Sequence, residues 1–241
     1  KLSKRRDNVS IQQFRAEGHL REALVNWIVR LGWSHGDDEI FSLDDIARLF
    51  DLDHVGRSAA RAETAKLFWL GQHYLKQLDA DDLFDRVRPH LEAVAGGPVR
   101  DEPGLRRLLD LLRERSHTLV EMAEQARWAV REPLEYDEKA VQKHLRPAAG
   151  PLLTALRAEL AALPAWDDAS IEKAFEHVAA ANGDIKLGKL AQPVRVAVTG
   201  GPVSPGIHET LAVLGPARTL ARIDDAIARI ERRDTSGAPG D

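Results

Sequence analysis

Apolar residues recur every three or four positions along almost the whole chain, which is the spacing that gathers them on one face of an α-helix. The last such stripe consists of Leu220, Ile223, Ile227 and Ile230. One segment instead alternates valines at positions 194, 196 and 198, the period of a β-strand. A lone short strand is not stable, so we interpret this segment as a helix that ends at Gly200. The sequence therefore predicts an all-α protein.

Capping residues and glycine–proline clusters divide this helical pattern. Ser42 and Thr118 are each followed three positions later by an acidic residue, the spacing of a capping box at a helix start. Residues 93–104 contain two glycine–proline clusters and are the clearest interruption. A second interruption lies at residues 147–151. The chain is therefore expected to form helical bundles in series.

The composition excludes several kinds of site. The 241 residues include no cysteine, so a disulfide framework, a thiolate metal site and a cysteine nucleophile are impossible. No two of the nine histidines have an H-x-x-x-H spacing, and no metal site is predicted. The net charge of −4 argues against coating nucleic acid by bulk charge, although local basic patches remain compatible with it. No apolar run approaches the length of a membrane span.

Two further features have a structural interpretation. The stretch "TGGPVSPG", residues 199–206, lacks the Lys-Ser/Thr pair of a nucleotide P-loop and is predicted to be a turn between two helices. Trp27, Trp33 and Trp69 lie beside apolar helical stripes and are predicted to pack in the core. Base stacking, which RNA-binding proteins use, is the alternative for these rings.

Several blocks of sequence, in the same order, resemble the motifs of one known protein family. The chain begins with "KLSKR", and "KLFWLGQHYLK" is similar to the family's K-L-x-W-x-x-x-x-Y-[IL] block. "RERSHTLVEMAE" is similar to its helical R-x-R-x-x-T-L-x-E motif. "IKLGKLAQPVRVAVTGGPVSPGIHETLAVLG" resembles the C-terminal signature almost end to end. Together these blocks resemble bacterial glutamyl-tRNA synthetases of class I, and the resemblance extends from Lys1 to about Arg232.

The resemblance implies a division into domains. Residues 1–79 would hold the "KLSKR" loop and a stem-contact helical domain. Residues 80–147 and 148–233 would form two helical-bundle subdomains that bind the anticodon. The polar residues 234–241 are expected to be a disordered tail.

In the family, "KLSKR" corresponds to the second ATP signature, the K-M-S-K-S-type loop. Lys4 is expected to be the catalytic residue, because its ammonium group would stabilise charge on the triphosphate while glutamate attacks the α-phosphate of ATP. The residues expected to bind ATP are Lys1, Leu2, Ser3, Lys4 and Arg5. The family usually continues with His-Gly, whereas this chain has Arg6 and Asp7.

The family's upstream Rossmann-like fold, its H-I-G-H-type motif and its glutamate pocket have no counterpart in this sequence. The resemblance therefore implies the C-terminal portion of a glutamate–tRNA ligase, an enzyme that uses ATP with Mg when it is complete. This portion alone is expected neither to activate glutamate nor to bind ATP tightly.

Five residues stand at anticodon-contacting positions of the family. Arg115 occupies the position where discriminating enzymes carry an arginine that senses the third anticodon letter, and Arg195 matches a second anticodon arginine. Ser204, Pro205 and Ile207 fall in the loop used beside the first letter. Without the resemblance, Arg115 reads as a cation at a helix C-terminus and Arg195 as half of a salt bridge.

The expected partner is glutamate tRNA, bound by a monomeric cytoplasmic protein without a membrane segment. The alternative is a non-enzymatic helical scaffold that binds protein partners, for which binding would not depend on anticodon sequence. A free-standing paralogue that glutamylates a modified tRNA base is disfavoured, because it lacks the C-terminal region found here.

Overall fold

The computed structural model describes residues 10–56 and 61–236 of the chain. The "KLSKR" loop and residues 237–241 of the predicted tail lie outside these ranges. The described residues form α-helices and one short 3-10 helix, with no strand; the only strand-like pairing among them is an isolated bridge between Trp33 and Val55. The all-α prediction is thereby confirmed. None of the described helices is long and apolar enough to cross a membrane.

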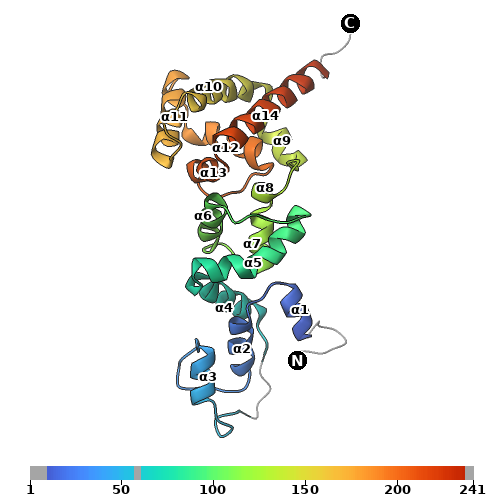
Figure 1. The fold of residues 1–241 in the computed structure, drawn as a ribbon, viewed down its shortest axis with the longest axis vertical. Helices are drawn as coiled ribbons and strands as arrows, with labels where there is room; N and C mark the ends of the chain where they lie inside the picture. Colours follow the sequence, from blue (N-terminus) through green and yellow to red (C-terminus); the bar gives the residue numbers. More distant parts are fainter. Residues whose placement is uncertain (1–9, 57–60, 237–241) are drawn as a thin grey trace. The chain divides into compact units, whose positions relative to one another are not determined.

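The described residues fall into two compact units (Figure 1). Unit 1 takes the residues up to 99 together with 109–126, and unit 2 takes 100–108 together with the residues from 127 onward. Helix α6 (Pro103–Leu112) contributes to both units. The predicted boundaries near residues 80 and 148 stay a prediction.

Unit 1 is built from paired helices: α2 packs on α4, and α5 packs on α7. Its helices besides the end of α6 are α1 (Ile11–Ala16), α2 (Arg21–Val29), α3 (Leu43–Leu49), α4 (Thr64–Gln77), α5 (Ala80–Ala95) and α7 (Leu119–Gln125). Asn26 is the buried polar centre of the first pair, since its Oδ1 accepts hydrogen bonds from the Phe41 amide at 2.8 Å and the Tyr74 hydroxyl at 2.9 Å. Burial raises the pKa of Tyr74 to about 12, so the phenol remains a donor.

The tryptophan prediction is right for two rings and wrong for the third. Trp27 and Trp33 are buried in unit 1. Trp69 is 43% exposed, because α4 turns its neighbour Leu70 into the core and leaves the indole on the outside. The Lys66 ammonium lies 5.5 Å from the centroid of the Trp69 ring, within the range of a cation–π contact.

Unit 2 is a cluster of helices packed around α12 (Leu187–Thr199) and α14 (Pro216–Ser236). The others are α8 (Arg127–Val130), α9 (Glu138–His144), the 3-10 helix η1 (Pro147–Ala149), α10 (Gly150–Ala161), α11 (Asp168–Ala181) and α13 (Ile207–Leu214). In Figure 1, α10 lies along α14 and α11 lies against α10.

The segment with alternating valines is helical, as predicted. Val194, Val196 and Val198 are all fully buried on α12. This helix packs against α9, α10, α11, α13 and α14, so most of its surface is covered. A helix buried on several sides needs apolar residues all round, which explains why the sequence lacks a one-faced stripe there.

The helix ends differ in part from the predictions. Ser42 forms both halves of its capping box with Asp45. Thr118 accepts from the Glu121 amide at 3.1 Å, but the Glu121 carboxylate accepts from the amide of His117 at 2.7 Å. At the C-terminus, α14 continues through Ser236, so residues 234–236 are helical where a disordered tail was predicted.

Gly71 sets the distance between α4 and the turn after α6. A Cβ atom at this position would lie 2.2 Å from the carbonyl oxygen of His117, inside any allowed contact distance. We predict that Gly71→Ala lowers the free energy of unfolding by about 1–3 kcal/mol, the cost of overpacking a tight contact. Urea denaturation measures this value.

Gly97→Ala is the matched control, since nothing lies within 4 Å of a Cβ at Gly97. The control should change the free energy of unfolding by no more than about 0.5 kcal/mol. Equal stability of the two variants would show that the close approach at Gly71 has no energetic weight.

Candidate functional site

The turn that carries Arg115, residues 113–118, is held against α4 of unit 1. The Arg113 guanidinium donates to the carbonyl of Leu75 at 3.1 Å and to that of Leu78. The side-chain amide of Gln72 donates to the backbone carbonyl of Glu114 at 2.7 Å. The backbone on the N-terminal side of Arg115 is therefore fixed by contacts far away in sequence.

Arg115 itself lies in this turn, three residues after the end of α6. Its amide donates to the carbonyl of Leu112 at 3.0 Å, and its own carbonyl accepts from the side chain of Gln125 at 3.2 Å. The residue is exposed. The structure therefore presents the Arg115 side chain at the surface of unit 1 from an anchored backbone.

The other four predicted anticodon residues come together in unit 2. Arg195 lies on α12, and its Nη1 donates to the Ser204 hydroxyl and to the carbonyl of Pro205, the latter at 2.6 Å. Ile207 is the first residue of α13 and is buried. The guanidinium thus bridges the helix to the loop that precedes α13.

This loop, residues 200–206, is fixed at both ends. Thr199 accepts from the Gly201 amide at 3.3 Å, and its hydroxyl donates to the carbonyl of Arg195 at 2.8 Å. Ser204 shares a hydrogen bond of 2.9 Å with the hydroxyl of Thr210 on α13. Between these anchors the Val203 side chain is 76% exposed.

Residues 131–137, called here the crossing segment, pack against the C-terminal end of α12. The Asp137 amide donates to the carbonyl of Gly200 at 2.8 Å, and the Tyr136 hydroxyl donates to that of Ala197 at 3.1 Å. Gly200 has a φ of +75°, and a Cβ there would lie 1.9 Å from the carbonyl oxygen of Glu135. Only glycine fits between α12 and the crossing segment.

Arg222, which the sequence reasoning missed, ties these parts together from α14. It is buried, and it donates to the carbonyl of Val198 on α12 and to that of Trp128 on α8, the latter at 2.9 Å. It also donates to the carboxylate of Glu132 in the crossing segment. Arg218 supports it from one turn earlier, with bonds to Glu132 at 3.0 Å and to the carbonyl of Ala129 at 2.9 Å. These residues form the Arg222 cluster.

The charges of this cluster depend on one another. Burial lowers the pKa of the Arg222 guanidinium, and the hydrogen bond that it donates to Glu132 opposes that effect. Burial would raise the pKa of Glu132, but the hydrogen bond and charge of Arg222, followed by those of Arg218, outweigh it and leave the pKa below its usual value. The pair is therefore held in its charged form.

The predicted stripe on the last helix is displaced by this arrangement. Ile223 and Ile230 are buried as predicted, whereas Leu220 and Ile227 are only half-buried. The rest of the buried face is formed by Thr219, Arg222 and Ala226. The signal that could have found the cluster is an arginine within the helical spacing of a buried face.

The structure gives no geometry for the predicted ATP site, since Lys1, Leu2, Ser3, Lys4 and Arg5 lie outside the described residues. Over residues 10–56 and 61–236 no three histidine, aspartate or glutamate side chains are grouped so that they could hold a metal ion.

Two family models match the chain. A model described as anticodon binding domain matches residues 82–227, which is more than half of the chain and includes Arg115, Arg195, Ser204, Pro205 and Ile207. The chain belongs to the anticodon-binding domain family. A second model, described as the catalytic domain of class I tRNA synthetases (E and Q), matches residues 1–69.

Solved structures give the same assignment for this member of the anticodon-binding domain family. A glutamate tRNA ligase from Elizabethkingia meningosepticum has a TM-score of 0.83 at 25% identity, covering 95% of this chain and 49% of the ligase. A glutamate-tRNA synthetase from Elizabethkingia anophelis has a TM-score of 0.74 at 28% identity, covering 89% of this chain and 42% of that protein. The chain thus spans about half the length of these proteins or less, and its resemblance to glutamyl-tRNA synthetases is confirmed.

The Arg222 cluster generates a stability prediction. Arg222→Met leaves the buried carbonyls of Val198 and Trp128 without a donor, so we expect the free energy of unfolding to fall by about 3 kcal/mol or more. Guanidinium denaturation measures the loss.

Arg157→Met is the matched control, because it removes an exposed arginine that pairs with Asp224 of the same helix α14. An exposed ion pair contributes about 0–1 kcal/mol, so the control should remain close to the parent chain. Losses of equal size in both variants would contradict the role given to Arg222.

Proposed function

We propose that this chain is the tRNA-binding portion of a glutamate–tRNA ligase and that it reads the anticodon of glutamate tRNA. The observation that carries the proposal is the cluster of Arg195, Ser204 and Pro205, held in place within a domain that matches an anticodon-binding family. Similarity to the solved structures of a glutamate tRNA ligase and a glutamate-tRNA synthetase supports the choice of glutamate tRNA.

The chemistry of the cluster suits an unpaired nucleotide. Anticodon bases are single-stranded, so a protein can bind their edges with hydrogen bonds and their faces with apolar groups. The cluster places a guanidinium, a hydroxyl and the exposed Val203 side chain around one loop. Since the loop is anchored before RNA arrives, less conformational freedom is lost on binding.

Arg115 is proposed to contact the third anticodon letter. An arginine offers a planar fork of donors that can bind a base edge in two places. The anchored turn in unit 1 supports this role by presenting the side chain from a fixed backbone. Arg115 and Arg195 belong to different units, so each assignment stands on its own local geometry.

For the whole protein we propose ATP-dependent activation of glutamate, with Mg as the accompanying ion, in a monomeric cytoplasmic enzyme. Lys4 would be the catalytic residue, and residues 1–5 would contact the triphosphate. The match of residues 1–69 to a class I catalytic domain supports this part of the proposal.

A binding titration tests the anticodon proposal directly. The chain is titrated with glutamate tRNA, the same tRNA with a swapped anticodon, and an unrelated tRNA, at several salt concentrations. Phosphate contacts make the affinities for all three tRNAs fall in the same way as the salt concentration rises. Base contacts instead give a difference in affinity between the tRNAs that persists at every salt concentration. Equal affinities at every salt concentration would favour the protein-binding scaffold instead.

Arg115→Gln is expected to weaken binding of glutamate tRNA by about 1–3 kcal/mol, the range for a good bidentate base contact. The difference in affinity between glutamate tRNA and glutamine tRNA should shrink, because glutamine lacks the charged fork of donors with which Arg115 would bind the third letter. Filter binding with both tRNAs measures this change.

Arg88→Gln on α5 is the control, because it removes an exposed arginine of the same unit. The control should leave the ratio between the two tRNAs unchanged. If Arg115→Gln weakened both tRNAs by the same factor, Arg115 would be a phosphate contact or a structural residue.

The chain of 241 residues is expected to show no glutamate-dependent pyrophosphate exchange. The family's H-I-G-H-type motif and glutamate pocket, which position ATP and glutamate for attack, have no counterpart in the sequence. The assay measures incorporation of labelled pyrophosphate into ATP with and without glutamate tRNA, and turnover by this chain would contradict the expectation.

A further inference from the structure

A cleft of about 460 Å³ opens in unit 2 between the end of α9 and the end of α14. Its lining residues are Gln142, Leu145, Arg146, Pro147, Ile230, Arg233 and Asp234. Leu145 and Ile230 are buried and form an apolar floor, while the polar side chains stand around the rim. None of these residues belongs to the predicted anticodon contacts.

Positive charge gathers around this cleft although the chain as a whole carries −4. Arg146 and Arg233 line it from opposite elements, and Lys143 and His144 occupy the last turn of α9. Burial lowers the pKa of His144, and the charges of Lys143 and Arg146 lower it further.

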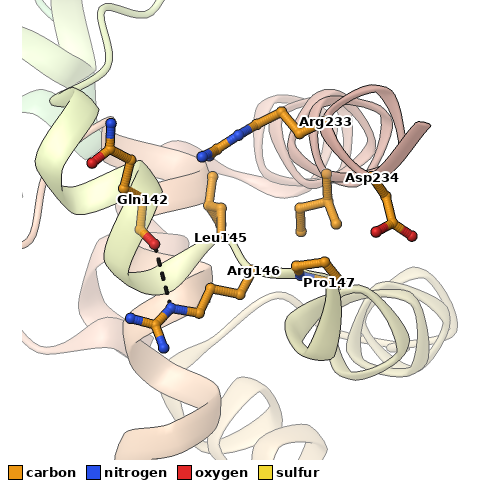
Figure 2. Close-up of a pocket in the computed structure, with 7 residues that line it drawn as sticks. Gln142, Leu145, Arg146, Pro147, Arg233 and Asp234 are labelled. Carbon is orange, nitrogen blue, oxygen red and sulfur yellow. Dashed lines mark hydrogen bonds between the residues drawn. The ribbon is translucent and has the colours of Figure 1, made fainter. Parts of the chain in front are cut away.

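The two guanidinium groups are only lightly used within the protein. Arg146 donates from Nε to the carbonyl of Gln142 at 3.3 Å, shown as the dashed line in Figure 2. No hydrogen bond or ion pair joins Arg233 to another residue within the described part of the chain. Arg222, by contrast, donates hydrogen bonds to the buried carbonyls of Val198 and Trp128.

Asp234 is the one acidic group in the lining, and it stands apart from the arginines. Figure 2 shows the Arg233 side chain reaching from α14 toward Leu145, whereas the carboxylate of Asp234 lies beside Pro147. The cleft therefore has a cationic end near α9 and an acidic end near η1. An anion would bind at the α9 end.

We propose that the cationic end of this cleft binds a phosphate group of the tRNA backbone, as a second RNA contact of unit 2. The inference rests on the proposed function, because it takes tRNA as the partner. Arginine suits a phosphate since its fork of donors matches the phosphate oxygens. A contact of this kind adds affinity and orientation without reading sequence.

The α9 wall of the cleft is linked to the anticodon cluster within unit 2. Helix α9 packs against α12, which carries Arg195, and the crossing segment leads directly into α9. The α14 wall belongs to the helix that carries Arg222. The two proposed RNA contacts therefore lie in one unit and are connected through the packing of α9 and α14 against α12.

The test compares salt dependence of tRNA binding for the parent chain and for Arg146→Gln/Arg233→Gln. Each phosphate contact contributes about 0.7–0.9 to the magnitude of the slope of log affinity against log salt concentration, so loss of this one contact in the double variant should reduce that magnitude by about 0.7–0.9. The affinities for glutamate tRNA and for its anticodon-swapped version should fall by the same factor, so the ratio of the two affinities stays unchanged.

Two further variants sharpen the result. Lys173→Gln removes an exposed charge on α11 that does not line the cleft, and it should leave the slope as it is. Asp234→Asn removes the acidic group of the cleft and should strengthen binding of both tRNAs.

The proposal is overturned if the double variant keeps the parent slope, or if Lys173→Gln lowers the slope equally. It is also overturned if the loss is confined to glutamate tRNA, because the cleft would then contact a base. If the parent chain bound the two tRNAs with equal affinity, the anticodon proposal would be refuted instead, whatever the salt slope of the cleft variants.

Discussion

The hydrogen bonds of Arg222 are the interaction on which the predicted anticodon-contacting part of unit 2 depends. One buried side chain supplies donors to α8, to the end of α12 and to the crossing segment. A buried guanidinium is costly unless its donors are used and its charge is paired, so the arrangement is favourable only when all three partners are in place. The position of the loop after α12 follows from that requirement.

Close backbone contacts at glycines also fix the positions of neighbouring segments within each unit. At Gly71, Gly104 and Gly200 a Cβ atom would lie within 2.7 Å of a carbonyl oxygen from another segment. Helices that approach this closely cannot slide past one another without breaking contact, because packed interfaces are not continuously deformable. The turn with Arg115 lies next to the contact at Gly71, and the loop with Ser204 follows Gly200. In each unit a predicted RNA-contacting residue is thus close to a point where the backbone is fixed.

The sequence predicted the helices well, because their apolar spacing and capping residues are local properties. Ser42 and Asp45 form the expected capping box, and Ile171, Phe175 and Val178 are buried on one face of α11. Arg195, Ser204, Pro205 and Ile207 were assigned by resemblance, and the structure brings them together. Arg222 was missed, since its role depends on carbonyls that are 24 to 94 positions away along the chain. The prediction for Trp69 was wrong because helical spacing alone does not show whether a residue at the edge of an apolar stripe is covered by a neighbouring helix.

In the proposed complex, the loop held by the Arg222 cluster meets the anticodon. Amide hydrogen exchange of the chain, with and without the anticodon stem-loop of glutamate tRNA, tests it most directly. Exchange over residues 195–210 is expected to slow when this RNA is added, and to slow less with a stem-loop that carries a swapped anticodon. Protection confined to other helices, with residues 195–210 unchanged by either RNA, would contradict it.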